Sequence, residues 1–471
     1  MIGIDVNDAP EIPPPQDRPP AFPVPEHTSR QLAVGWLSLG LAALVASGLF
    51  SVLLVLSRTP AIQERIPWLD FFHTALVVHV DLSVLIWFLS FAGVLWSLAG
   101  GGRGAFWGWS ALTLCALGTA IIALAPFGGA GNPLMNNYIP VLDHPLFLTG
   151  LGLFGGGFLL LVARTLLVPA PVDNGGGAYT APLQFAMRTS ALTAAVALTA
   201  FAWSWLDVPA TLQGQAYYEL LFWGGGHILQ FTHTLLLLVA WVWLAHACGA
   251  TMAVGRKTLT LLFAMTAAPV LLALPIYLGD DVASLQHRLG FTQLMKYGGL
   301  AALPAGIVVI LSLPGTRRAT AAQRPARAAL LASLLLFTTG GILGFMIEGV
   351  NVVIPAHYHG SIVGVTLAFM GLSYHLLPRL GFGDPAPRLA TIQPWVYGGG
   401  QLLHILGLAW SGGYGVQRKT AGVAQGLDSL EKVVGMGMMG LGGLIAIIGG
   451  LLFVIVALGA MWRRTGGSPS G

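Results

Sequence analysis

The chain has 471 residues, of which 55% are hydrophobic and only 8% are charged. An ordinary soluble domain carries roughly a quarter charged residues, so a soluble globular protein is excluded and lipid is the expected solvent. The formal net charge is +4, but the Lys and Arg residues stand in short loops between apolar stretches. That arrangement is a topology signal, so membrane lipid is an expected partner and nucleic acid is not.

Both ends of the chain differ from its apolar middle. Residues 1–30 are rich in Pro and Asp and lack the basic-then-apolar order of a cleavable signal peptide. Their composition is typical of a disordered segment. We therefore expect a disordered cytoplasmic tail over 1–30, one membrane domain over 31–463 and a second cytoplasmic tail over 464–471.

Twelve apolar stretches are long enough to cross a membrane, which takes about 20 residues. A lone strand in lipid would leave its backbone groups unpaired, so each stretch is predicted to be a helix. The expected fold class is an all-α, polytopic membrane bundle of about twelve transmembrane helices. The stretches are 33–57, 72–98, 106–126, 144–168, 184–205, 216–246, 257–278, 291–313, 326–347, 357–378, 391–411 and 436–461.

The loop charges predict the orientation of this bundle. With the amino terminus inside, fifteen of the 22 Lys and Arg residues fall on the inner side, six fall on the outer side, and Lys296 lies inside a span. Inner loops carry the excess of Lys and Arg, so both termini are expected in the cytoplasm of a bacterial-type inner membrane. Lys296 could serve a proton path from the cytoplasm, or it could lie near the outer end and reach water.

Any bound metal is expected to depend on histidine. The two cysteines, Cys115 and Cys248, lie in apolar stretches without a partner at metal-ligand spacing. Several of the twelve histidines lie deep in spans, where a histidine is costly unless it is paired, ligated or facing water.

The tenth span begins with two histidines, His357 and His359, separated by two positions. Such residues lie about 200° apart around an α-helix and face opposite ways. One helix could therefore ligate two different haems, one on each side. The alternative is a pair of helix-end histidines that are satisfied by neighbouring groups.

This region resembles a known family. The stretch from His357 through Gly371 and Leu376–Pro378 is similar to the tenth helix of haem-copper oxidase catalytic subunits, which are related to subunit I of cytochrome c oxidase. The resemblance implies two haems: His357 would ligate a high-spin haem, and His359 a low-spin haem. It also implies the fold of oxidase subunit I.

The second span supplies the other expected ligand of the low-spin haem. The sequence from Val78 to Phe88 is similar to the family's second helix, and His79 takes the place of its histidine. His73 is the rival, because Leu69–Thr74 also resembles the start of this helix in divergent members. Two imidazoles on one iron fill both axial positions, which suits electron transfer and prevents ligand binding.

Two further motifs extend the resemblance. In the sixth span, Leu221–His227 is similar to a signature whose histidine ligates copper, and its glycines would allow haem or metal to approach closely. A lone histidine makes a poor copper site, and a polar residue satisfied between helices is the alternative. After the eleventh span, Arg418 and Lys419 resemble a basic pair that meets haem propionates, although they could be plain loop charges.

Other positions depart from the family pattern. Ala273 and Leu274 stand where the seventh helix normally carries two copper-binding histidines, and Phe231 replaces a tyrosine that many members have. The nearest substitutes are expected to lie too far toward the outer end of the helix to reach; they are Asp280, Asp281 and His287. The sequence is thus identified as a divergent member with an incomplete copper site, in which bound copper is doubtful.

The resemblance implies a membrane respiratory-chain oxidoreductase subunit. Electrons would pass from the low-spin haem to the high-spin haem, which would reduce O2 or NO. The partners expected are a small diatomic gas and an electron-donating subunit or a cytochrome c-type protein. The alternative is an oxidase-derived haem protein without copper that transfers electrons or senses gas.

Overall fold

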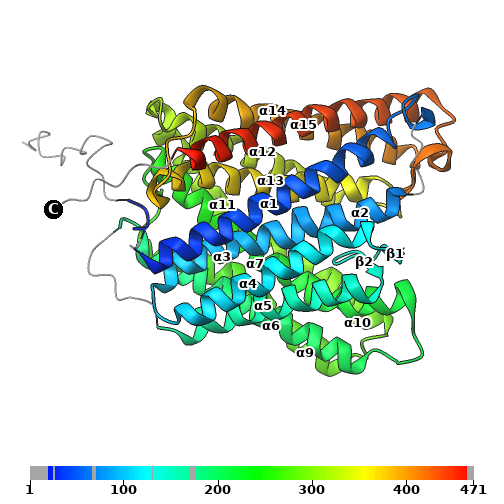
Figure 1. The fold of residues 1–471 in the computed structure, drawn as a ribbon, viewed down its shortest axis with the longest axis horizontal. Coiled ribbons are helices and arrows are strands. Elements are labelled where there is room, and N and C mark those ends of the chain that lie inside the picture. The colour runs from blue at the N-terminus through cyan, green and yellow to red at the C-terminus, as the bar shows by residue number, and fades with distance from the viewer. Residues whose placement is uncertain (1–19, 25–26, 66–70, 130, 170–176, 464–471) are drawn as a thin grey trace, which may run out of the picture.

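The structure is a computed structural model, and it describes residues 20–24, 27–65, 71–129, 131–169 and 177–463. Helices run side by side along the long axis of the bundle (Figure 1). Both described ends of the chain lie at the same end of the bundle, as an even number of crossings requires.

The helices follow one another with short connections. The first half of the chain contains α1 (Thr28–Leu56), η1 (Gln63–Arg65), α2 (Phe72–Val80), the π-helix η3 (Asp81–Ile86), α3 (Trp87–Gly100), α4 (Ala105–Leu124), η4 (Ala125–Phe127), α5 (Pro145–Leu167), α6 (Thr180–Asp207) and α7 (Gly214–Ala247). The second half contains α8 (Arg256–Ala267), η5 (Ala268–Leu272), α9 (Ala273–Gly279), α10 (Leu285–Gln293), the π-helix η6 (Leu294–Gly298), η7 (Gly299–Ala302), α11 (Leu303–Ser312), η8 (Leu313–Arg318), α12 (Arg324–Phe345), α13 (Val353–Leu376), η9 (Pro378–Leu380), α14 (Pro387–Gly413), η10 (Gly422–Gln425) and α15 (Leu430–Trp462).

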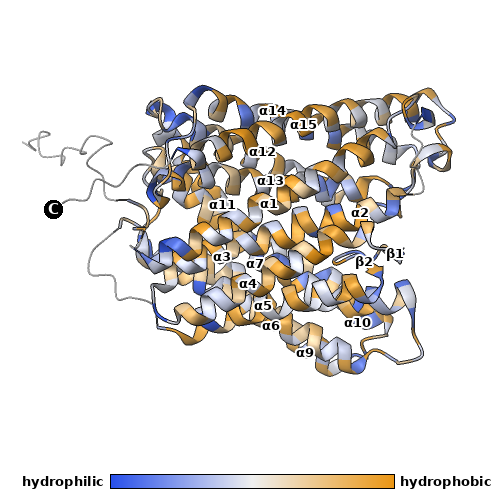
Figure 2. Ribbon diagram, in the orientation of Figure 1, coloured by the Kyte–Doolittle hydropathy of each residue, from blue (hydrophilic) through white to orange (hydrophobic). Residues whose placement is uncertain are grey.

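The predicted membrane bundle is confirmed. Among the described residues, eleven helical rods are long and apolar enough to cross a membrane, and several of these rods join two or more of the segments above. The predicted span 391–411 falls within α14, which brings the number of long rods among the described residues to twelve. It packs against α13 and α15. Hydrophobic residues predominate along the helices of the bundle, as a membrane environment requires (Figure 2).

Two local features were not predicted. A short antiparallel hairpin of β1 (Asn132–Leu134) and β2 (Val141–Asp143) lies between the third and fourth spans, with Pro133 opposite Leu142. The eighth span begins at Leu285 and not at the predicted residue 291. Both features lie at the ends of spans, where the hydropathy signal on which the prediction depends fades.

Part of the segment that was predicted as a disordered tail packs against the bundle. Phe22 is buried, and its ring centroid lies 5.4 Å from that of Trp243. The backbone carbonyl of Ala21 accepts a hydrogen bond from the amide of Tyr179 at 3.0 Å. The structure therefore differs from the expectation at residues 20–24, while residues 1–19 and 464–471 lie outside the described residues.

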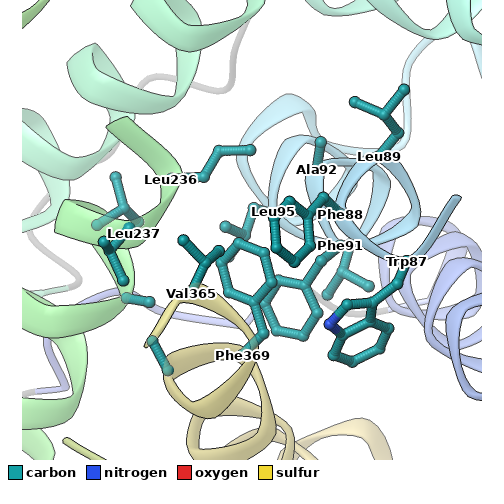
Figure 3. Close-up of a cluster of buried hydrophobic side chains, with 14 of the residues drawn as sticks. Trp87, Phe88, Leu89, Phe91, Ala92, Leu95, Leu236, Leu237, Val365 and Phe369 are labelled. Atoms are coloured by element: carbon teal, nitrogen blue, oxygen red, sulfur yellow. The ribbon is translucent and has the colours of Figure 1, made fainter. Parts of the chain in front are cut away.

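A layer of aromatic rings fills the middle of the bundle (Figure 3). Phe91 of α3 stacks on Phe369 of α13 with ring centroids 4.1 Å apart, and Phe88 packs edge-on against the same ring. These rings lie nine to twelve residues after His79 and His359 on their respective helices, which is roughly 14 to 18 Å of helix. The histidines thus lie on one side of a dry aromatic layer.

Candidate functional site

His79 is held firmly by the helix α1. Its Nδ1 lies 3.1 Å from the carbonyl oxygen and 2.9 Å from the Oγ of Ser47. The hydroxyls of Ser47 and Ser83 both donate to the backbone carbonyl of His79, at 3.2 Å and 2.6 Å. Because the π-helix η3 begins two residues later, the backbone is locally widened next to this histidine.

His359 lies close to two other histidines. Its ring centroid is 4.7 Å from that of His404 on α14, and it is within electrostatic range of His79 and Arg58. His79 and His359 are both half-buried. The structure therefore brings together His79 and His359, which were predicted as a ligand pair.

His357 points away from this pair, toward α12. Its Nδ1 lies 2.7 Å from the carbonyl oxygen of Gly340. A Cβ at Gly344 would meet the His357 ring at 2.7 Å, so glycine leaves the room that the imidazole occupies. The two histidines of the tenth span face different helices, as their spacing predicted.

Four buried or enclosed histidines share one hydrogen-bonding pattern. In each, Nδ1 lies within hydrogen-bonding distance of a backbone carbonyl, which fixes the Nδ1–H tautomer and leaves Nε2 with its lone pair. Metal-ligating histidines have this pattern, because the second nitrogen orients the ring. The four contacts are His79 with Ser47, His227 with Trp223, His357 with Gly340 and His404 with Met439.

Aromatic rings surround His227. The centroid of its ring is 4.7 Å from Tyr138, 4.8 Å from Trp223 and 5.8 Å from Phe291. The expectation that the preceding glycines would admit haem or metal is wrong. Side chains fill the space beside them, because a Cβ at Gly224, Gly225 or Gly226 would collide with the rings of Tyr277, Phe201 and Tyr138.

The side chains near His227 do not form a copper site. No group of three or more His, Cys, Asp or Glu side chains in the described part of the chain is arranged to hold a metal ion. Phe291 packs against both His227 and His287, with centroids 5.8 Å and 5.0 Å away. Leu274 is 58% exposed, so that position does not face the centre of the bundle. Copper does not fit the residues present.

Arg418 and Lys419 lie in the loop between α14 and η10. Arg418 donates to Asn137 Oδ1 at 2.9 Å, and Lys419 donates to the carbonyl of Met135. Glu219 accepts from the amide of Asn137. Arg418, Lys419 and Glu219 are therefore all hydrogen-bonded to the loop of the hairpin. The Tyr358 side chain, between the two histidines of α13, interacts with Arg418.

A pocket of about 430 Å³ opens beside these bases. Three cationic side chains line it together with one carboxylate; they are Arg288, Arg418, Lys419 and Glu219. Burial, together with the nearby Arg418, lowers the pKa of Lys419 to about 8. The Lys419 backbone is left-handed, with φ of 58°, which an ordinary residue adopts only where its surroundings hold it.

The rival ligand His73 has a different environment. Its Nε2 lies 3.0 Å from the carbonyl oxygen of Lys419, and the side chain is exposed. A nitrogen that donates to a carbonyl has no lone pair for a metal. Lys296 is also exposed, with its ammonium 5.9 Å from the centroid of Phe345, which favours the reading in which it reaches the surface.

Several residues of the site were missed in the sequence. No motif in the sequence singles out His404, Ser47 or Arg58. Burial lowers the pKa of Arg58 to about 10, and its positive charge acts on His359. Asp81 is fully buried, and neither carboxylate oxygen has a hydrogen-bond partner among the described residues. Its position after His79 in an apolar span was the available signal.

Known proteins share the sequence and the fold of this chain. The family model for cytochrome c and quinol oxidase polypeptide I matches residues 31–452. An uncharacterized protein of Rickettsia prowazekii (strain Madrid E) is 32% identical, over 91% of this chain and 95% of its own length. An uncharacterized protein of Aquifex aeolicus (strain VF5) is 27% identical, over 76% of this chain and 88% of its own.

A solved structure has the same fold. The chain of a haem-copper terminal oxidase dimer, determined by cryo-EM, superimposes with a TM-score of 0.71 at 18% sequence identity. The match covers 93% of this chain and 85% of that chain.

Proposed function

Because the chain is an integral membrane protein of the cytochrome c and quinol oxidase polypeptide I family, we propose that it passes electrons between two histidine-held haems to a small diatomic gas. O2 is the first candidate substrate and NO the second. The observation that carries the proposal is the placement of His357 and His359 on opposite sides of α13, with His79 within range of His359.

The side chains present fit two haems. His79 and His359 are half-buried side chains of two different helices, and His79 has its Nδ1 bonded to a carbonyl and its Nε2 available. His357 has the same arrangement on the other side of α13. When bound, a bis-histidine haem supplies one-electron transfer and a haem with one histidine supplies a site for a gas.

The residues around the ligands have separate tasks. Ser47 orients the imidazole of His79, and the Gly340 carbonyl orients that of His357. Arg418 and Lys419 supply positive charge at the outer end, where they would pair with carboxylates of the haems. The aromatic layer of Phe88, Phe91 and Phe369 excludes water on the inner side.

The proposal includes an electron donor and an orientation. A partner subunit or a cytochrome c-type protein would deliver electrons at the outer side, close to the pocket lined by Arg288, Arg418 and Lys419. Both termini would be cytoplasmic in a bacterial-type inner membrane. The loop charges support this, because the inner side carries the excess of Lys and Arg.

A second candidate function has its own support. The residues around His227 do not form a three-ligand metal site in the described part of the chain. A protein that keeps both haems without a second metal could transfer electrons or sense a gas without reducing it. In this case the gas would bind at the His357 side and would not be consumed.

Turnover separates the two candidates. The purified protein, reduced with ascorbate and a small mediator, is supplied with O2 or NO in a closed electrode chamber. The first proposal predicts steady consumption of one gas that a His357→Ala variant loses. Binding of carbon monoxide or NO without consumption of either gas would contradict reduction and support the second candidate.

A further inference from the structure

A histidine on α14 lies directly beside the proposed low-spin haem ligand. The ring centroids of His404 and His359 are 4.7 Å apart, with an angle of 56° between the rings. His404 is only 7% exposed. Two imidazoles so close together, inside a membrane bundle, need a reason, because each buried ring nitrogen needs a partner.

The far side of His404 is fixed by α15. Its Nδ1 lies 2.9 Å from the carbonyl oxygen of Met439, so Nδ1 carries the proton and Nε2 carries a lone pair. Glycines of α15 make this approach possible. A Cβ at Gly442 would collide with the backbone of His404, and one at Gly443 would lie 3.3 Å from its Nδ1. The ring of His404 is therefore held with an acceptor atom free.

His359 differs from the other proposed ligands. The Nδ1 atoms of His79 and His357 lie 3.1 Å and 2.7 Å from backbone carbonyls. In the part of the chain that the structure describes, no backbone carbonyl is hydrogen-bonded to the ring of His359. A ligating histidine needs such a partner for orientation and basicity, and His404 is the ring packed against it.

We propose that His404 is the positioning residue of His359. Its Nε2 accepts the hydrogen bond from Nδ1–H of His359, while its own Nδ1–H donates to Met439. The row from Met439 through His404 to His359 then orients the imidazole of His359 and leaves its Nε2 for the haem. This inference rests on the proposed function, because it assigns His359 to a haem.

Gln401 is the rival partner. It lies one turn before His404 on α14, and its side chain lies within hydrogen-bonding reach of the His359 ring. Its Oε1, the atom that could accept from His359, is buried without a hydrogen-bond partner. Gln401 therefore provides a matched variant, because it lies near His359 and is on the same helix as His404, α14.

The test compares His404→Leu with Gln401→Leu in the full-length protein. Haem content is measured by pyridine haemochrome, and the low-spin haem by its EPR g values and its midpoint potential. Loss of an acceptor at Nδ1–H makes the imidazole a weaker electron donor, which stabilises the ferric iron less. His404→Leu should thus keep two haems, shift the g values and raise the potential, while Gln401→Leu leaves all three unchanged.

Several results would overturn the inference. Wild-type g values and potential in His404→Leu would do so, as would a shift in Gln401→Leu alone. Complete loss of the low-spin signal in His404→Leu would make His404 the ligand itself. If His404→Leu does not assemble, His404→Asn decides by the same criteria, because its shorter side chain can serve Met439 but not reach His359. Absence of a low-spin haem from the wild-type protein would instead refute the proposed function.

Discussion

Around His359 the imidazoles are braced by carbonyls and by one another, whereas around His227 aromatic rings fill the available space. The first region joins α1, α2, α13 and α14, and two of its histidines, His79 and His404, contact backbone carbonyls through Nδ1. The second region joins α7 and α10 and has one oriented histidine among Tyr138, Trp223 and Phe291. Haem needs one or two axial ligands, and a lone metal ion needs three or more, so only the first region has enough histidines for the group that we propose there.

The largest expected effect comes from one substitution in each region. His359→Ala should remove the low-spin haem, so that haem content falls from two per chain to one and the low-spin signal disappears. His227→Ala should leave both haems in place. Pyridine haemochrome analysis and reduced-minus-oxidised spectra make the comparison, and equal haem loss in the two variants would show that the regions do not differ.

The next effect concerns the basic pair above the histidines. Arg418→Met removes a charge-assisted partner for a haem carboxylate, which is worth about 2 kcal/mol, or roughly 30-fold in haem affinity. The rate of haem transfer to apomyoglobin measures this loss. Lys432→Met is the control, because Lys432 is also on the outer side but pairs with Asp428 at 2.7 Å. Equal rates of haem transfer in the two variants would show that Arg418 does not pair with a haem carboxylate.

The charge of Lys419 makes a prediction about pH. Burial and Arg418 lower the pKa of Lys419 to about 8, and carboxylates of a bound haem would raise it again. Above this pKa the site loses one positive charge. Positive charge stabilises the reduced haem more than the oxidised haem, so its loss disfavours reduction. The midpoint potential should therefore fall as the pH rises from 7 to 10, and Lys419→Arg, which stays charged, should flatten the change. The same slope in both proteins would exclude Lys419 as its source.

The smallest effect is expected at Ser47. Ser47→Ala removes the hydroxyl contacts to His79 but keeps the carbonyl at 3.1 Å. The loss of about 1 kcal/mol corresponds to roughly fivefold faster haem transfer. Ser51→Ala, in which only a bond to Gly48 within the same helix is lost, is the matched control. A slower transfer from Ser47→Ala than from Ser51→Ala would contradict the orienting role.

Much of the fold could be predicted from the sequence, because lipid allows helices and little else. Runs of apolar residues therefore located the helical rods, including α14. The hairpin of β1 and β2 could not be found in this way, because it lies in a loop that hydropathy does not describe. Ordered residues such as Phe22 were missed because their burial depends on a distant partner, Trp243.

The site could be predicted only where a motif carries its own spacing. The two positions between His357 and His359 are enough to place them on opposite sides of a helix. The contacts of His404 and Ser47 depend on how α14 and α1 pack against α13 and α2, and no local pattern reveals this. The glycines before His227 were misread, because a sequence does not say whether a cofactor or a neighbouring ring occupies the space beside a glycine.

The central claim is that the chain retains its haem ligands and lacks a copper site. Haem, iron and copper content of the purified protein, together with reduced-minus-oxidised spectra with and without carbon monoxide, test it most directly. The account predicts two haems per chain, one of which binds carbon monoxide, and copper far below one per chain. Stoichiometric copper would contradict the incomplete site at His227, and fewer than two haems would contradict the ligands assigned to His79, His357 and His359.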